Sequence, residues 1–156
     1  MLEYDWENSV GYWICMTSHE MRKALGMQLN QEGITLRQWE VLACLSSQGC
    51  GSQSELAEHL SIEPNTLAGV LSRMQKAGLL ERKNCSEDRR RKRIHPTEKA
   101  EAVWKRVTAI CHTMRAQAIS GLSSDEVALL KKLCGHIRQN VAAVIQDQQT
   151  QKADVA

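Results

Sequence analysis

Two short helix patterns, only three residues apart, constrain the fold of this chain more than any other feature. Ser52-Gln-Ser-Glu55 is a capping box, in which a serine hydroxyl and a glutamate carboxylate each bind a backbone amide at a helix start. It predicts a short helix that ends at about residue 60. Pro64 suits the first position of the next helix, because an amide there would have no partner, and Gly78 ends that helix near Ala77. The spacing is typical of a helix-turn-helix.

The helix that begins at Pro64 has two chemically different faces. On a helical wheel, an arc of about 100° holds the apolar residues Leu67, Val70, Leu71 and Met74. The opposite face, which contains no carboxylate, carries Asn65, Thr66, Gly69, Ser72, Arg73 and Lys76. Small residues allow close approach, asparagine and arginine can make paired hydrogen bonds to base edges, and lysine binds phosphate. We therefore expect this face to bind the major groove of DNA; the alternative is a solvated face of a helical bundle.

The amides that open the preceding helix are a second expected DNA contact. They belong to Ser52, Gln53 and Ser54, and the start of a helix attracts phosphate.

A basic segment follows the two helices. Ser86–Arg93 includes a turn and five consecutive cations, and residues 79–99 carry a net charge of +4, whereas residues 1–47 carry −3. If residues 79–84 and 91–95 pair as strands, the turn projects from the body as a wing. Arg89, Arg90 and Arg91 would then reach a narrow minor groove, where the negative potential is strongest. The alternative is a solvated loop.

Long amphipathic helices are predicted on both sides of this region. Apolar residues recur at three- and four-residue steps over residues 5–31, 97–120 and 123–145, and a capping box at Thr35-Leu-Arg-Gln38 opens a further helix. The chain has only two prolines to interrupt them. The expected fold is mainly α, with six helices and a small antiparallel wing of two or three strands.

Several function classes lack support in the sequence. No run approaches 18 apolar residues and no basic leader is present, so we expect a cytoplasmic, nucleoid-associated protein with no membrane contact. The six cysteines contain no C-x-x-C pair, and no nucleophile motif, phosphate loop or paired carboxylates appear. We expect no metal, no cofactor and no enzymatic activity.

Three motifs resemble the MarR family of winged-helix transcription regulators. They read GITLRQWEVL, SELAEHLSIEPNTLAGVLSRMQKAGLLER and DRRRKRIHPTEKA, and the resemblance runs from about residue 10 to residue 145. Pro96 and Ala100 replace a leucine and a glycine that are usual in the family. Glu63 stands where the family often has a serine that caps the recognition helix, so Glu63 is a poor candidate for a DNA contact.

The resemblance implies a homodimeric repressor whose two recognition helices enter successive major grooves of a pseudo-palindromic operator. Arg90 would be the minor-groove arginine, and Asp88 would position the wing by pairing with a nearby arginine. Residues 1–33 and 97–147 would form the helical dimerisation region, residues 34–96 the DNA-binding domain, and residues 148–156 a flexible tail. Amphipathic stripes on three long helices agree, because one small chain cannot cover that much apolar surface.

The family commonly releases DNA when a small, often aromatic and anionic, compound enters a crevice beside the winged helix. The candidate lining residues are Tyr12, Trp13, Met16, Trp39 and Ala43. Alternatively, these residues pack in the dimer interface.

Two other functions stay open from the sequence. Cys15 lies roughly where the peroxide-sensing branch of the family has its reactive cysteine, which makes thiol-based regulation an alternative. A winged helix that binds an acidic protein partner is another, and a steep salt dependence of DNA binding would argue against it.

Overall fold

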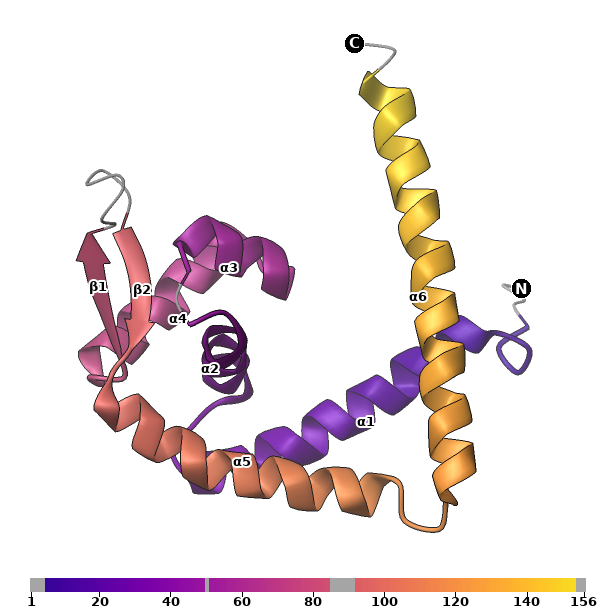
Figure 1. Ribbon diagram of the computed structural model, residues 1–156, viewed down its shortest axis with the longest axis horizontal. Coiled ribbons are helices and arrows are strands. Elements are labelled where there is room, and N and C mark those ends of the chain that lie inside the picture. Colours follow the sequence, from indigo (N-terminus) through magenta and orange to yellow (C-terminus); the bar gives the residue numbers. More distant parts are fainter. Residues whose placement is uncertain (1–4, 50, 85–91, 154–156) are drawn as a thin grey trace, which may run out of the picture. The chain divides into compact units, whose positions relative to one another are not determined.

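The computed structural model describes residues 5–49, 51–84 and 92–153. In that part of the chain the order of elements is α1 (Val10–Gln31), α2 (Leu36–Gln48), α3 (Gln53–Leu60), α4 (Pro64–Lys76), β1 (Leu80–Asn84), β2 (Lys92–Pro96), α5 (Glu98–Ala118) and α6 (Ser124–Ala153) (Figure 1). The chain divides into two compact units, residues 1–115 and residues 116–156. The predicted fold class, mainly α with a small antiparallel wing, is confirmed.

The first helix begins later than its apolar pattern predicts. Ser9 caps α1, and its Oγ accepts the Tyr12 amide at 3.2 Å. Just before it, the Asp5 carboxylate accepts the side-chain amide of Asn8 at 2.7 Å and its backbone amide at 3.2 Å, and these bonds lower the pKa of Asp5. Such local bonds offer the backbone an alternative to the helix. The helix expected from residue 5 therefore starts at Val10.

Capping boxes open α2 and α3 as predicted. Thr35 N donates to Gln38 Oε1 at 2.9 Å, and Gln38 N donates to Thr35 Oγ1 at 3.3 Å. Ser52 N donates to Glu55 Oε2 at 2.8 Å, and Glu55 N donates to Ser52 Oγ at 3.2 Å. Both helix starts are thus held by bonds within four residues of chain, which is why the sequence locates them.

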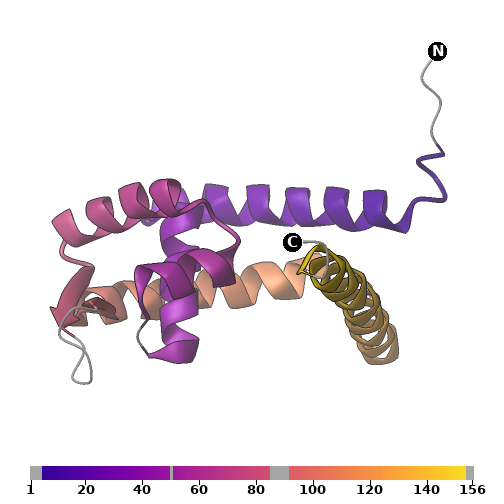
Figure 2. The same ribbon diagram turned by 90° about the horizontal axis from the view of Figure 1, so that it is seen from above.

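The core of the first unit lies between α2, α3 and α4 and is closed by parts of α1, α5 and the wing. Its largest fully buried side chains are Leu29, Val41, Leu45, Leu56, Leu67, Leu71, Met74 and Val107. The helix α2 crosses the C-terminal part of α1 (Figures 1 and 2), where Arg22 Nη1 lies 2.6 Å from Glu40 Oε1. Arg37 binds the other oxygen of the same buried carboxylate at 2.9 Å. The ion pair between Arg22 and Glu40 therefore joins α1 to α2 at the edge of the apolar core.

The wing is a two-stranded ladder with a single additional bridge. The strands β1 and β2 pair antiparallel from Leu80 with Pro96 to Asn84 with Lys92. Gly51 adds one bridge to Ile94, with hydrogen bonds of 3.3 and 2.8 Å, and within the described ranges this bridge is what is seen of a third strand. Pro96 ends β2, and the helix expected from residue 97 begins at Glu98 as α5. A proline is tolerated at the end of an edge strand because its missing donor breaks no inner ladder bond.

The second unit contains the last residues of α5 and the whole of α6. A capping box also opens α6: Ser123 N donates to Glu126 Oε2 at 2.7 Å, which lowers the pKa of Glu126. The helix continues to Ala153, although a polar tail was expected from residue 148. Glutamine is a good helix former, so a glutamine-rich end need not fray. None of the helices in the described ranges is both long and apolar enough to cross a membrane.

Candidate nucleic-acid interface

The polar face of α4 is exposed along its whole length. The buried stripe of this helix is the predicted one, Leu67, Val70, Leu71 and Met74. The opposite side exposes Asn65, Thr66, Ser72, Arg73 and Lys76, with Gly69 half-buried at its centre. The structure thus brings the six predicted residues onto one surface, which we call the α4 front. Basic residues in the last turn and an absence of acidic residues from the first give it a positive character.

Gly69 and Arg73 are neighbours on the α4 front. A β-carbon built at Gly69 would lie 3.6 Å from Arg73 Nη1, so the guanidinium lies back along the helix over the glycine. That distance is ordinary van der Waals contact, and no neighbouring backbone blocks a side chain there. The glycine is therefore not required by packing within the chain.

The start of α4 is capped without help from a side chain. Glu63 occupies the N-cap, its carboxylate forms no capping bond, and it is exposed. A carboxylate there is favourable to the helix dipole but would repel a DNA phosphate. The Glu63 carboxylate therefore lies beside the α4 front and forms no capping hydrogen bond.

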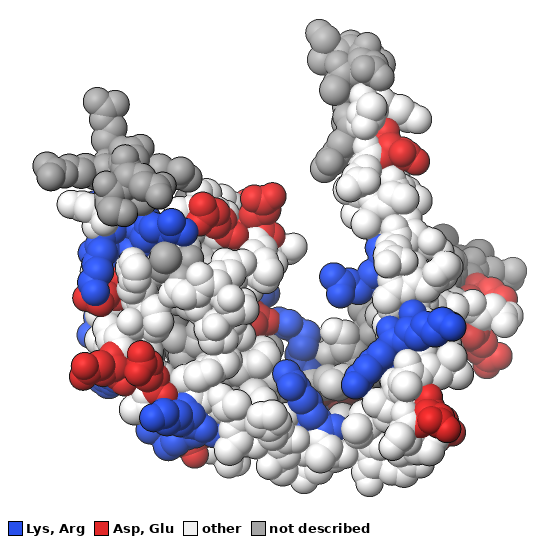
Figure 3. Space-filling model, viewed as in Figure 1, with Lys and Arg blue, Asp and Glu red and all other residues white. Residues whose placement is uncertain are grey.

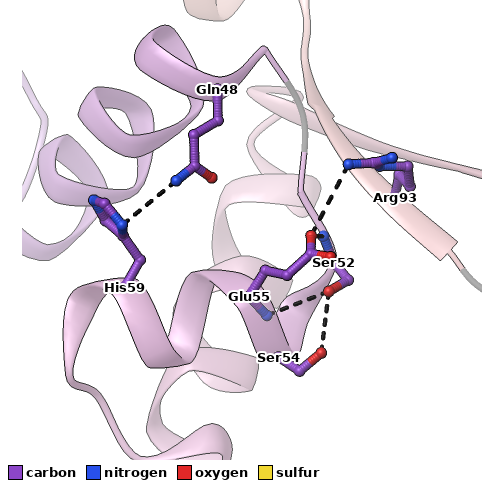
Figure 4. A network of polar contacts seen from close by, with 6 residues as sticks. All are labelled: Gln48, Ser52, Ser54, Glu55, His59 and Arg93. Atoms are coloured by element: carbon purple, nitrogen blue, oxygen red, sulfur yellow. Dashed lines mark hydrogen bonds and ion pairs between the residues drawn. The ribbon is translucent and has the colours of Figure 1, made fainter.

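The start of α3 and strand β2 of the wing meet in one polar network (Figure 4). Ser52 Oγ lies 3.0 Å from Ser54 Oγ, and Arg93 Nη2 of β2 lies 4.0 Å from Glu55 Oε2. Arg93 Nε is buried and has no hydrogen-bond partner among the described residues. Of the three predicted phosphate-binding residues, Ser54 is exposed, and Ser52 and Gln53 are half-buried. The network connects this helix start to the wing strand.

Basic side chains cover the described part of the wing (Figure 3). Arg82, Lys83 and Lys92 are exposed there, although Lys83 Nζ binds Glu81 Oε1 at 2.7 Å. The four residues predicted to act at the wing tip lie outside the described residues: Asp88, Arg89, Arg90 and Arg91.

The five candidate effector residues fall into two groups. Tyr12 and Trp13 have ring centroids 5.5 Å apart near the start of α1, with the exposed Met16 one turn further on. Trp39 and Ala43, both half-buried, are one turn apart on α2. The bond between Arg22 and Glu40 places α2 beside a point ten residues beyond Tyr12, which is about 15 Å along a helix. Within the chain, the aromatic residues of α1 and Trp39 therefore lie in different places.

An apolar pocket lies instead between α2 and the beginning of α5. Its volume is about 180 Å³, and its lining residues are Leu42, Ser46, Pro96, Ala100, Glu101 and Trp104. A cavity of about 150 Å³ is known to hold benzene. The pocket can therefore accommodate one aromatic ring with a small substituent, and Glu101 is its single charged lining residue.

The described residues give little support for a reactive cysteine or for a metal site. Cys15 is a free, exposed cysteine on α1. Burial raises the pKa of the Cys44 and Cys111 thiols, which keeps them protonated. No three His, Cys, Asp or Glu side chains within the described ranges are grouped as metal ligands.

Sequence reasoning missed three kinds of functional residue. Glu40 lies among buried residues of α2, and the sequence pattern around it predicted the helix but not its ion pair with Arg22. Trp104 was not singled out, because its pocket is completed by α2, more than fifty residues away in the chain. Thr97 and Lys99 were noted only as part of the family motif, although Lys99 binds the C-cap of α4 and Thr97 binds the turn that follows it.

Comparison with known proteins agrees with this architecture. The sequence pattern of the MarR family matches residues 34–92. The transcriptional regulator PA3341 is 30% identical, with a TM-score of 0.80; the match covers 86% of this chain and 99% of that protein. MepR from S. aureus, solved in a complex with DNA, is 26% identical, with a TM-score of 0.75 and coverage of 86% and 98%. A mutant of MarR from E. coli complexed with operator DNA is 25% identical, with a TM-score of 0.75 and coverage of 82% and 92%.

A helix-turn-helix, an antiparallel wing and long flanking helices together define a winged-helix transcription regulator. The family pattern over residues 34–92, together with a match to PA3341 over 86% of this chain, places the protein more narrowly. The chain belongs to the MarR family. The resemblance inferred from its motifs is confirmed.

Proposed function

We propose that this protein is a homodimeric repressor that binds a pseudo-palindromic operator in double-stranded DNA and is released by a small molecule. The observation that carries the proposal is the α4 front, which is exposed, free of carboxylates and opposite a fully buried stripe. The solved DNA complexes of MepR and of the E. coli MarR mutant support it. A regulator of chromosomal DNA would act in the cytoplasm, at the nucleoid, and would need no enzymatic activity.

In this proposal the contacts divide by chemistry. Asn65, Thr66, Ser72 and Arg73 read base edges, while Lys76 and the residues at the start of α3, Ser52, Gln53 and Ser54, bind phosphates. Arg89, Arg90 and Arg91 reach the minor groove, and Asp88 positions the wing. Residues 1–33 and 97–147 supply the dimerisation region around the DNA-binding domain of residues 34–96. Tyr12, Trp13 and Met16 then pack against the second protomer.

Gly69 tests whether the α4 front approaches DNA closely. Gly69→Ala should stabilise the protein by about 0.5–1 kcal/mol, because alanine loses less backbone entropy in a helix and has room there. The same methyl group should weaken operator binding roughly tenfold, the size of one lost base contact, because it holds the helix away from the groove. Thermal unfolding and fluorescence anisotropy with a labelled duplex measure the two effects.

Gly26→Ala is the matched control for that substitution. Gly26 lies inside α1, and a β-carbon there would meet the Leu36 β-carbon at an unstrained 3.8 Å. It should gain similar stability and bind DNA as the unsubstituted protein does. If Gly69→Ala is more stable and binds the operator equally well, the α4 front does not enter the groove.

We further propose the pocket between α2 and α5 as the effector site. Its volume and apolar lining suit a single aromatic ring, and Trp104 supplies a ring to stack against. Glu101 at its edge favours a neutral or cationic compound, in contrast to the anionic effectors that the resemblance implies. Phenol, benzoate and benzylamine are matched probes, because they share one ring and differ in charge.

Ser46→Leu should fill this pocket from its exposed edge. Among the described residues Ser46 Oγ donates to the carbonyl of Ala43 in its own helix, so its replacement breaks no described hydrogen bond between elements. We expect operator affinity to stay within about twofold, a difference of 0.4 kcal/mol, while release by phenol or benzylamine is lost. Ser47→Leu, one residue further and outside the pocket lining, should respond as the unsubstituted protein does. Equal release from both variants would place the effector elsewhere.

A further inference from the structure

The C-cap of α4 and the turn that follows it are held by the beginning of α5 through three hydrogen bonds. Thr97 Oγ1 donates to the Gly78 carbonyl at 2.7 Å, and Thr97 N donates to the Leu79 carbonyl at 3.1 Å. Lys99 Nζ donates to the Ala77 carbonyl, at the C-cap of α4, at 2.8 Å. We call Thr97 and Lys99 the α5 clamp.

Of the three bonds, the one from Lys99 uses a group that a helix end leaves unsatisfied, while the two from Thr97 hold the turn that follows. The last carbonyls of a helix have no partner inside it and carry a partial negative charge, which a cation stabilises. Gly78 turns the chain away with a φ of 72°, and this exposes the carbonyls to α5. Lys99, although exposed and basic, is therefore occupied by the protein's own backbone.

The two helices so joined differ in how they are anchored. The beginning of α5 is fixed in the core through Ala100, Val103 and Val107, which are 1%, 8% and 0% exposed. The helix α4 rests on the core by one stripe alone, because its other side is the exposed front. A helix held on one stripe can tilt about it, so a second attachment at its end defines its direction.

We propose that Thr97 and Lys99 are positioning residues that orient α4 for reading base sequence, without touching DNA themselves. The inference rests on the proposed function of the α4 front. Base-edge hydrogen bonds weaken steeply away from linear geometry, whereas phosphate contacts tolerate small displacements. Loss of the clamp should therefore reduce discrimination between sequences more than it reduces binding to DNA in general.

The same turn of α5 also lines the effector pocket. Pro96, Ala100 and Glu101 face that pocket, and Thr97 and Lys99 lie between them in the chain. A compound in the pocket would thus press on the turn that holds the end of α4. The α5 clamp would thus connect the proposed effector pocket to the C-cap of α4.

Lys99→Met tests the clamp, because it keeps the length of the side chain and removes the ammonium group. Affinity for a duplex selected from a random-sequence library by the unsubstituted protein should fall roughly two- to fivefold, the range of a cation at a helix end. Affinity for an unselected duplex, and the slope of log K against log salt, should not change. Lys99→Arg should restore the selected-duplex affinity, since arginine keeps both the charge and the N–H donors. Lys105→Met, an exposed lysine two turns along α5, is the control for lost charge.

Two results would overturn the inference. A phosphate contact at Lys99 would lower affinity for both duplexes and make the salt slope shallower by about 0.9. General destabilisation would lower the active fraction equally for both duplexes, so their affinity ratio would stay constant.

Amide hydrogen exchange tests the clamp without DNA. Exchange at residues 77–79 should accelerate in Lys99→Met and return to normal in Lys99→Arg. Unchanged exchange would overturn the clamp itself. If exchange accelerates but library selection enriches no duplex, the proposed function is wrong and the assignment of the clamp to sequence reading falls with it.

Discussion

Leu130→Asp is expected to yield a monomer that has lost nearly all operator affinity. Leu130 lies at the centre of an apolar stripe on α6 and is 50% exposed in the single chain. The other exposed members of that stripe are Leu133, Val141, Val144 and Ile145. A carboxylate buried between two such stripes would lack a partner, and its desolvation would favour separated protomers.

The expected loss follows from the linkage of two recognition helices. In a dimer, the second α4 binds at the high effective concentration set by the first, which strengthens binding roughly 10²- to 10⁴-fold. A monomer loses that factor although its own α4 front is intact. Sedimentation equilibrium gives the oligomeric state, and anisotropy titration against full and half operators gives the affinities. The variant should bind the full and half operators alike.

Gln139→Asp is the control for Leu130→Asp. Gln139 is exposed on the opposite side of α6 and receives the same new charge. We expect it to stay dimeric with unchanged affinity. A Leu130→Asp protein that is dimeric and binds normally would exclude α6 from the dimer interface.

The features that the sequence predicts best are those that depend on residues close together in the chain. The capping boxes at Thr35 and Ser52 each close within four residues, so their letters alone locate the helix starts. The buried stripe of α4 follows from a 3.6-residue period and agrees at every predicted position. The resemblance to the MarR family rests on the same region and is confirmed.

Features that depend on distant partners could not be read from the sequence. Lys99 binds a carbonyl 22 residues away, and nothing in its neighbours distinguishes it from a solvated lysine. The pocket needs α2 and α5 together, so the sequence alone did not single out Trp104 as a lining residue. The start of α1 was misplaced for a different reason, because the bonds between Asp5 and Asn8 compete with a helix that the apolar pattern favours.

The candidate DNA contacts divide in the same way. The surface of α4 follows from periodicity, so its six residues were found together. The role of each residue depends on where the bases lie, which neither the sequence nor the free protein contains. Substitutions on the α4 front are therefore the most direct test of the reading assignment.

Arg73→Ala is expected to cost about 1–3 kcal/mol of binding to the cognate operator, roughly a 5- to 150-fold loss, and much less on an unselected duplex. The Arg73 guanidinium is exposed on the α4 front and lies over Gly69, where the helix can approach DNA most closely. A guanidinium can make two parallel hydrogen bonds to one guanine, so its loss affects sequence reading more than electrostatic attraction. Gln75→Ala, exposed on the flank of α4, should bind both duplexes normally. Equal losses on cognate and unselected DNA, with a shallower salt slope, would instead make Arg73 a phosphate contact and move sequence reading to another part of the α4 front.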